Sequence, residues 1–179
     1  MPGRPHLSVR SRRPTRCGAY AVRARLAALL VVPFLAACSA GTVDIPTPDL
    51  DDTARAACEA FTADLPPSIY EEPRRDVEPA DALGGAYGDP AIVVRCGVPV
   101  PADFDEAVSS CEVANDVGWY VSPIDFDDQE ADVTLTAAGY RPVVEVSVPG
   151  SYRPNGTAAA IAQLAATVEE HLTLVENCD

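Results

Sequence analysis

The chain has 179 residues, 47% of them hydrophobic, and a formal net charge of −14. This length and this hydrophobic fraction are ordinary for one globular domain. The charge is unevenly distributed: residues 1–37 contain seven arginines and no acidic residue, whereas residues 38–179 contain six arginines and all 27 acidic residues. The second part therefore has a formal charge of −21, which argues against nucleic acid as a partner and favours a soluble monomer.

The first 37 residues have the pattern of a lipoprotein signal peptide. A basic stretch, residues 1–25, precedes an apolar run, residues 26–37, which suits a signal h-region and is too short to span a membrane. The run ends in Leu35-Ala36-Ala37-Cys38, which resembles a lipobox, the cleavage and acylation motif of bacterial lipoproteins. A diacylglycerol on Cys38 would anchor the chain stably, because two acyl chains hold where one does not. We therefore predict export and lipidation of Cys38 at the extracytoplasmic face of the cell membrane.

Two alternatives stay open for this leader. An ordinary signal peptide followed by a chance cysteine would also be cut after an A-x-A-like site. The export route is open as well, because Ser11-Arg12-Arg13 is similar to part of a twin-arginine signal. The residues that follow lack the usual hydrophobic pair, so the sequence favours the Sec route.

The next stretch is predicted to be a tether followed by a helix. Residues 38–52 read as the lipidated cysteine and a flexible tether, because they are small, proline-containing and acidic without periodicity. Such a tether would have a root-mean-square reach of about 20 Å. A helix is expected from Asp52 or Thr53 to about Leu65, with Cys58 on its apolar face. Residues 68–89, rich in proline, glycine and charge, are expected to form an irregular surface connection.

Four strands and a second helix are predicted in the remainder. The apolar run 91–96 indicates a central strand buried on both faces, and three later segments alternate with period two. A helical pattern then begins at Thr157 and continues to Val175. We expect one α+β domain over residues 53–179, with a four-stranded, largely antiparallel sheet and both helices on one face. The three later strands are expected at residues 117–122, 132–137 and 140–149.

Three segments of this domain are similar to a known family. Residues 88–97 (GDPAIVVRCG), Trp119-Tyr120 and residues 141–146 (RPVVEV) resemble an actinobacterial family of proposed lipoproteins, domain of unknown function 3515. The resemblance covers nearly the whole predicted domain. It implies an envelope location and no assigned activity, and it transfers no catalytic residue. The chain departs from the family where Tyr87 replaces a common tryptophan and Asp116 replaces a common glycine.

Four cysteines remain when Cys17 in the leader and Cys38 are set aside. In an exported domain they are expected to form two disulfides, for which three connectivities are possible. We favour Cys58–Cys178 and Cys96–Cys111, the first joining the two helices and the second joining two strands. A zinc site is disfavoured, because the sequence lacks a CxxC pair and has one histidine, His171, after the leader. We predict no metal and no cofactor.

Catalytic chemistry finds little support in the sequence. His171 is expected at the solvated end of the last helix, and no phosphate-binding glycine loop is present. A pair of carboxylates could serve a glycosidase, although no pair stands out. The acidic cluster between the second and third predicted strands is expected to be a solvated turn, with weak calcium binding as the alternative. Its members are Asp125, Asp127, Asp128, Glu130 and Asp132.

The candidate binding residues are scarce types in an acidic domain. If they converge, they would form a pocket for an anionic or glycan ligand; otherwise the arginines are ion-pair partners, such as Arg95 with Glu145, and Trp119 is core. We predict a non-enzymatic, membrane-anchored domain that binds an envelope protein or a cell-wall component. The alternatives are a carboxylate-dependent cell-wall or glycan hydrolase and, less favoured, a calcium-dependent adhesion module. The candidate residues are Arg74, Arg75, Arg95, Trp119, Tyr120 and Arg141.

Overall fold

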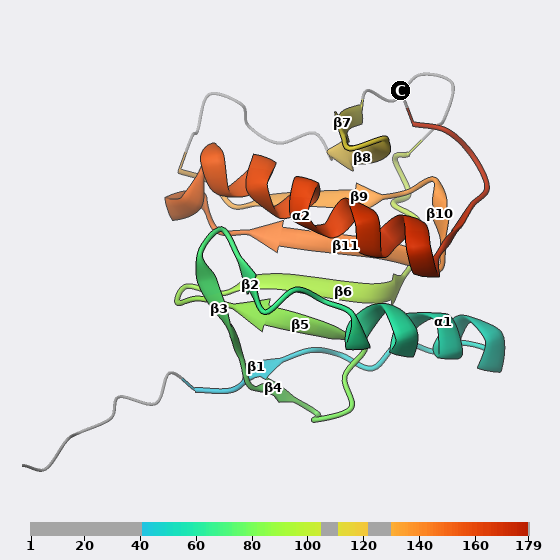
Figure 1. The fold of residues 1–179 in the computed structure, drawn as a ribbon, viewed down its shortest axis with the longest axis horizontal. Coiled ribbons are helices and arrows are strands. Elements are labelled where there is room, and N and C mark those ends of the chain that lie inside the picture. The colour runs from blue at the N-terminus through green and yellow to red at the C-terminus, as the bar shows by residue number, and fades with distance from the viewer. Residues whose placement is uncertain (1–40, 105–110, 122–129, 179) are drawn as a thin grey trace, which may run out of the picture. The chain divides into compact units, whose positions relative to one another are not determined.

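An antiparallel sheet of eight strands with two helices forms the body of the domain (Figure 1). The computed structural model describes residues 41–104, 111–121 and 130–178. The predicted signal peptide, Cys38, and Asp125, Asp127 and Asp128 of the acidic cluster lie outside the described residues. Neither described helix is long and apolar enough to cross a membrane.

The sheet has the order β2-β3-β5-β6-β11-β9-β8-β7, and every neighbouring pair in it is antiparallel. Two short pairs accompany it, β1 with β4 and β10 with β12. The helices are α1 (Asp52–Ala63), α2 (Asn155–His171) and a 3-10 turn, η1 (Gly150–Tyr152). The strands are β1 (Val43–Asp44), β2 (Ser68–Ile69), β3 (Glu72–Arg75), β4 (Val77–Glu78), β5 (Gly84–Tyr87), β6 (Ile92–Val98), β7 (Cys111–Ala114), β8 (Val117–Val121), β9 (Val133–Ala137), β10 (Tyr140–Arg141), β11 (Val143–Val148) and β12 (Thr173–Leu174).

The α+β class and the antiparallel sheet are confirmed, but the prediction of four strands is wrong. The four predicted strands are β6, β11, β9 and β8, which are neighbours at the centre of the sheet. The missed strands β2, β3 and β5 come from the segment expected to be an irregular connection, and β7 adds an edge. Their sequences hid them, because β3 reads EPRR and β5 reads GGAY, and glycine, proline and charge are uncommon in strands.

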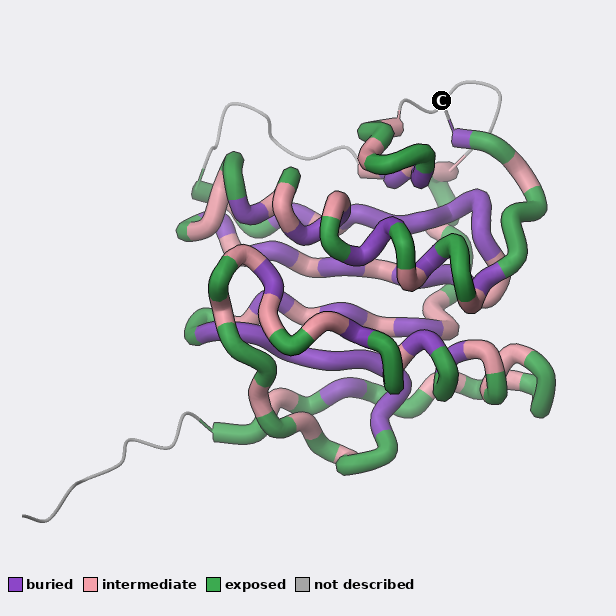
Figure 2. The backbone as a smooth tube through the Cα atoms, viewed as in Figure 1, coloured by how far each residue is buried: buried purple, intermediate pink, exposed green. Residues whose placement is uncertain are grey.

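Both helices lie in front of the sheet in Figure 1, and the core fills the space between the two layers. Buried residues alternate along β6: Ile92, Val94 and Cys96 are in the core, whereas Val93 and Arg95 are half-buried on the other face. The prediction that this strand is buried on both faces is therefore wrong. Figure 2 shows the same alternation of buried and partly exposed residues along the central strands. A sheet covered by helices on one face has this pattern.

Most of the predicted flexible tether packs on the domain instead. The backbone N–H of Val43 donates to the carbonyl oxygen of Asp76 (3.1 Å), and that of Ile45 donates to the oxygen of Glu78 (2.9 Å). The side chain of Ile45 is buried. Leu50 lies against Gly97, where a Cβ would come within 2.6 Å of the leucine Cδ1. Residues 43–51 are thus a strap, which we call the N-terminal strap, because its apolar side chains have places to bury.

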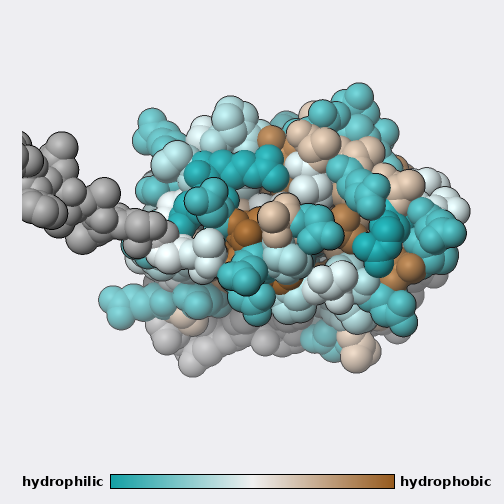
Figure 3. Space-filling model, turned by 90° about the horizontal axis from the view of Figure 1, so that it is seen from below, coloured by the Kyte–Doolittle hydropathy of each residue, from teal (hydrophilic) through white to brown (hydrophobic). Residues whose placement is uncertain are grey.

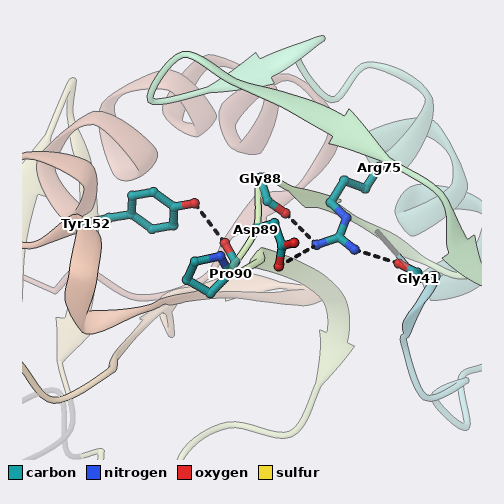
Figure 4. Close-up of polar contacts among 6 residues, drawn as sticks. All are labelled: Gly41, Arg75, Gly88, Asp89, Pro90 and Tyr152. Carbon is teal, nitrogen blue, oxygen red and sulfur yellow. Dashed lines mark hydrogen bonds and ion pairs between the residues drawn. The ribbon is translucent and has the colours of Figure 1, made fainter. Parts of the chain in front are cut away.

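Arg75 fastens Gly41, which precedes this strap, to the turn between β5 and β6 (Figure 4). Its guanidinium donates to the carbonyl oxygens of Gly88 and Gly41, each at 2.6 Å, and lies 3.6 Å from the Asp89 carboxylate. The hydroxyl of Tyr152 donates to the carbonyl oxygen of Pro90 (2.9 Å) and holds the same turn from η1. The start of residues 88–97, one of the three segments that carry the family resemblance, is therefore a structural junction.

The last helix ends earlier than its apolar pattern. Helix α2 stops at His171, and the chain continues as β12, which pairs antiparallel with β10. Val175, predicted on the apolar face of the helix, is 54% exposed. The backbone N–H groups of Val175 and Glu176 both donate to the carbonyl oxygen of Gly139 (2.9 and 3.2 Å). This C-terminal segment, residues 173–178, runs toward β8 instead of staying beside α1.

All four predicted cysteines are in disulfides, but the favoured pairing is wrong. The bonds are Cys58–Cys96 and Cys111–Cys178, with Cα–Cα distances of 5.5 and 5.6 Å. Cys58 on α1 faces the core side of β6, where Cys96 lies. Cys178 is carried away from α1 because α2 ends at His171. The first disulfide therefore joins α1 to β6, and the second joins β7 to the C-terminal segment. The sequence pattern alone does not bring these elements together.

The two-residue turn between β7 and β8 is strained at Asp116. Asn115 and Asp116 have φ values of 48° and 67°, as in the type I′ hairpin turn, which prefers glycine at the second position. We expect Asp116→Gly to raise the free energy of unfolding by about 1 kcal/mol, measured by urea denaturation. Asp116→Asn removes the same charge but keeps the strain, so it should change stability little. A destabilising Asp116→Gly would contradict the strain argument.

Candidate functional site

The four arginines predicted to bind a ligand do not converge. Arg74 donates to the carbonyl oxygen of Thr62 (3.3 Å), and Arg75 holds the junction described above. Arg95 and Glu145 form an ion pair across β6 and β11, with the arginine Nε 3.1 Å from Oε1. Arg141 donates to the carbonyl oxygens of Ala138 and Tyr140 and pairs with Glu176 (3.0 Å). Each arginine is occupied in a different part of the fold, and the predicted Arg95–Glu145 pair is confirmed.

Trp119 and Tyr120 do not form an aromatic platform. They are adjacent on β8, so their side chains point to opposite faces of the sheet. Trp119 is fully buried in the main core. Tyr120 is buried in a second cluster with Cys178, where its ring packs edge-on against Phe104 at 5.3 Å between centroids. The core alternative for Trp119 is therefore correct, and a pocket built from these six residues is not.

A different site lies on both sides of the C-terminal segment. Two hollows flank it, a larger one of about 560 Å³ and a smaller one of about 280 Å³. The side chains of residues 173–175 alternate between them, since Thr173 and Val175 line the larger hollow and Leu174 lines the smaller. We call the two hollows together with residues 173–178 the β12 surface.

The larger hollow is mainly aliphatic. Of its polar side chains, Asp51 caps α1 by accepting from the backbone N–H of Ala54 (2.8 Å), and Arg141 is paired as described. His171 Nε2 lies 2.7 Å from Asp64 Oδ2. The charged groups thus have partners within the protein, and the hollow offers apolar contact. Its lining is Leu50, Asp51, Thr53, Ala54, Ala57, Gly97, Val98, Val100, Arg141, Pro142, Val143, His171, Thr173 and Val175.

The smaller hollow is lined by two glycines on which the C-terminal segment lies directly. A Cβ at Gly118 would collide with the carbonyl oxygen of Cys178, and one at Gly139 with that of Glu176. Burial raises the pKa of Tyr140 in this hollow, and the negative charges of Glu169 and Asp116 raise it further. The potential here is therefore negative. The lining is Val113, Asp116, Gly118, Gly139, Tyr140, Leu174, Glu176, Asn177 and Cys178.

The exposed large hydrophobic side chains of the described residues all belong to the β12 surface. Val100 (37% exposed) and Val175 (54%) line the larger hollow, and Val113 (60%) and Leu174 (51%) line the smaller. On the face seen in Figure 3, hydrophobic residues appear as separate areas among hydrophilic ones. Exposed hydrophobic residues that gather at concave sites mark interaction surfaces more often than scattered ones do.

One set of side chains has the composition of a cation site. The ligand atoms of Asp64, Glu170 and His171 lie within 4.8 Å of one another. Two carboxylates and an imidazole could bind zinc with an open position, but both carboxylates are exposed and His171 is already paired with Asp64. Because His171 is paired with Asp64, the expectation that its side chain is solvated is wrong. From the predicted acidic cluster, Asp132 accepts from the backbone N–H of Gly150 (2.9 Å).

The β12 surface was not found from the sequence, apart from Arg141. Val175 was assigned to a buried helix face, and Leu174 was not singled out. A short signal was nevertheless present, because the chain past His171 reads LTLVENCD, in which the polar Thr173 stands between Leu172 and Leu174. That period of two is typical of a strand. Its shortness, directly after a long helical pattern, hid it.

The comparisons with known proteins identify a family and no function. One protein-family model matches residues 20–176, and its description is "Protein of unknown function (DUF3515)". No curated protein and no solved structure matches the chain. The match covers all of the described domain except its last two residues. It carries no catalytic or ligand-binding residue to the β12 surface.

Proposed function

Since the chain belongs to the DUF3515 family of proteins of unknown function, we propose its function from its own geometry. It is a non-enzymatic binding domain of the cell envelope, anchored to the membrane through a lipid on Cys38, that docks a partner protein on the β12 surface. The observation that carries this proposal is the gathering of Val100, Val113, Leu174 and Val175 around the two hollows.

A protein partner suits the β12 surface better than a glycan does. Sugar rings are commonly bound by stacking on exposed aromatic side chains, as amphipathic rings suit aromatic faces. The described lining of the larger hollow has no aromatic residue, and the smaller hollow has only Tyr140, which is buried. Aliphatic hollows instead accept apolar side chains from another chain. The geometry therefore favours an envelope protein over a cell-wall component, the two partner classes that the sequence predicts.

The hydrolase alternative gains no support from this site. A glycosidase needs two carboxyl groups that face one cleft about 5–10 Å apart. Asp51 is the one carboxylate among the described residues that line the larger hollow, and it caps α1. In the smaller hollow Glu176 is paired with Arg141, and the other carboxylate is Asp116 in the exposed hairpin turn. Neither hollow holds a pair that suits this chemistry.

The N-terminal strap supports an outward-facing surface on an anchored protein. Gly41 follows Cys38 by three residues, a distance of at most about 10 Å of extended chain, and it is fastened to Arg75 and the Gly88 turn. That turn precedes β6, whereas the larger hollow borders Gly97 and Val98 at the far end of the same strand. A strand of this length spans about 20 Å. An anchor at Cys38 therefore places the β12 surface on the side remote from the attachment point.

The anchor is tested by replacing its cysteine. We expect Cys38→Ala to move the protein from the membrane fraction to the soluble fraction or to leave it unprocessed, because no diacylglycerol can be attached. Cys17→Ala, in the predicted leader, is the matched control and should remain at the membrane. Cys38→Ala protein that has lost its leader and still stays in the membrane fraction would contradict the lipid anchor without bearing on the binding surface.

The docking surface is tested by crosslinking in the intact envelope. A photo-crosslinking amino acid at Leu174 should give a discrete crosslinked species with one envelope protein. The same group at Ser151, exposed in η1 at the other end of the sheet, should not give it. Equal crosslinking from both positions, or none from Leu174, would contradict docking on the β12 surface.

A further inference from the structure

The β12 surface has a chemistry that selects its partner. We propose that it binds a cationic segment of an envelope protein, one in which aliphatic side chains enter the two hollows and lysine or arginine residues lie between and beside them. This inference rests on the proposed function and specifies the partner. The shape, the apolar contacts and the charges of the β12 surface each support a cationic segment as its occupant.

The shape calls for a segment that crosses β12. Leu174 of this strand lines the smaller hollow, and its neighbours Thr173 and Val175 line the larger one. The hollows therefore lie on the two sides of one strand, and a single segment passing over it can place a side chain in each. Both Leu174 and Val175 are more than half exposed, so covering them would bury apolar area that the free protein leaves in water.

The C-terminal segment is held rigidly enough to serve as a docking ridge. It is closed by the Cys111–Cys178 disulfide and by the ion pair of Glu176 with Arg141. Its backbone is fixed by two hydrogen bonds to the carbonyl oxygen of Gly139. A surface that is ordered before binding loses less conformational entropy on association.

The acidic charge is concentrated at the smaller hollow. Asp116 and Glu176 line the smaller hollow, whereas Asp51 and Arg141, of opposite charge, line the larger one, and Glu170 is next to its lining residue His171. The nearby cation Arg141 is already paired with Glu176. Arg55, next to the lining residue Ala54, is the other described cation beside the larger hollow.

Charge complementarity therefore favours a cationic partner. The part of the chain after the leader has a formal charge of −21, which repels acidic segments and accelerates the approach of basic ones. Apolar hollows alone would not discriminate between the two. The combination of aliphatic hollows with an acidic border distinguishes a basic, aliphatic segment from an acidic one of the same hydrophobicity.

The test compares three synthetic peptides with the same valine and leucine residues. At the positions between these residues, one peptide has lysine, the second serine and the third glutamate. The full chain is placed in nanodiscs of zwitterionic lipid, and empty nanodiscs provide the blank. Binding is measured by fluorescence anisotropy at two salt concentrations. We expect the lysine peptide to bind at least tenfold more tightly than the serine peptide. The glutamate peptide should bind most weakly. Higher salt should reduce the difference between the lysine and serine peptides, because it screens exposed charges.

Two variants separate apolar docking from general charge attraction. Leu174→Ser with Val175→Ser removes the anchors without changing the charge, and it should weaken the lysine peptide at least tenfold. Asp116→Asn removes one carboxylate of the smaller hollow and should reduce the preference for lysine over serine. The native fold of each variant is checked by near-ultraviolet circular dichroism.

Each other outcome overturns the inference in a recognisable way. Equal binding of the three peptides, lost in the Leu174/Val175 variant, would overturn the charge preference and leave the proposed docking surface intact. Tight lysine-peptide binding that survives in that variant would show attraction to the acidic surface at large and overturn the site. If no peptide binds, the inference fails, while the proposed function is judged separately by the Leu174 crosslink.

Discussion

Replacing Cys58 and Cys96 together by alanine is expected to lower the free energy of unfolding by about 4 kcal/mol. The bond closes a sequence separation of 38 residues, and loop closure of that length removes entropy from the unfolded chain worth about 4 kcal/mol. Both cysteines are buried between α1 and β6, so the loss cannot be relieved by local detachment. Against a typical stability of about 5–15 kcal/mol, the variant would be only marginally folded.

The second disulfide provides the control for this prediction. Cys111–Cys178 closes a longer separation of 67 residues, so chain entropy alone predicts a similar loss. Cys178, however, ends a segment that can detach while the main core remains. We expect Cys111→Ala with Cys178→Ala to cost about 2 kcal/mol, because detachment restores entropy to the native state. Urea denaturation of both variants decides, and a greater loss from the Cys111/Cys178 pair would contradict this ranking.

The centre of the sheet was predictable because its strands carry a clear period. In β8, β9 and β11 the apolar residues that recur at every second position are buried, with Val121 alone half-buried, although Tyr120, Thr136 and Val143 are buried as well. The strands outside this central group carry no such pattern. Strand β5 is fully buried yet reads GGAY, since Gly84 leaves room for the carbonyl oxygen of Val94 and Gly85 lies under Leu65. A glycine required by close approach is indistinguishable in the sequence from a glycine in a loop.

The strap and the disulfide pairing failed for a common reason, which is that both depend on tertiary contacts. Residues 43–51 have the composition of a linker, but Ile45 and Leu50 find positions against the domain. The pairing of Cys178 depends on where α2 ends, and that end is set by the pairing of β12 with β10. Neither fact is local to the residues concerned.

The arginines are a poor guide to the candidate site, because a residue type that is scarce in a domain need not bind a ligand. Arginines are few in this domain, and each of the four singled out is needed to satisfy carbonyl oxygens or carboxylates of the protein itself. The residues that now carry the proposal, such as Leu174 and Val175, are common types. Only their exposure beside a hollow distinguishes them, and exposure follows from the three-dimensional arrangement.

Trp119→Ala is expected to cost about 4 kcal/mol of stability, a loss that marks the residue as core and not as part of a ligand site. Its side chain is fully buried among the residues of the main cluster, and removing a buried tryptophan creates a cavity that costs about 3–5 kcal/mol. The chain has one tryptophan. Its fluorescence should therefore be blue-shifted and resistant to iodide quenching in the folded protein.

Trp119→Phe is the matched control, because it keeps an aromatic ring and removes the indole N–H. That nitrogen, Nε1, is buried and has no hydrogen-bond partner among the described residues, and an unsatisfied buried donor costs about 1–3 kcal/mol. Its removal offsets part of the lost volume, so the phenylalanine variant should be within about 1.5 kcal/mol of the parent. If Trp119 contacted a ligand instead, alanine would leave stability unchanged and abolish binding. Thermal unfolding of the three proteins, together with peptide binding to the β12 surface, separates the two cases.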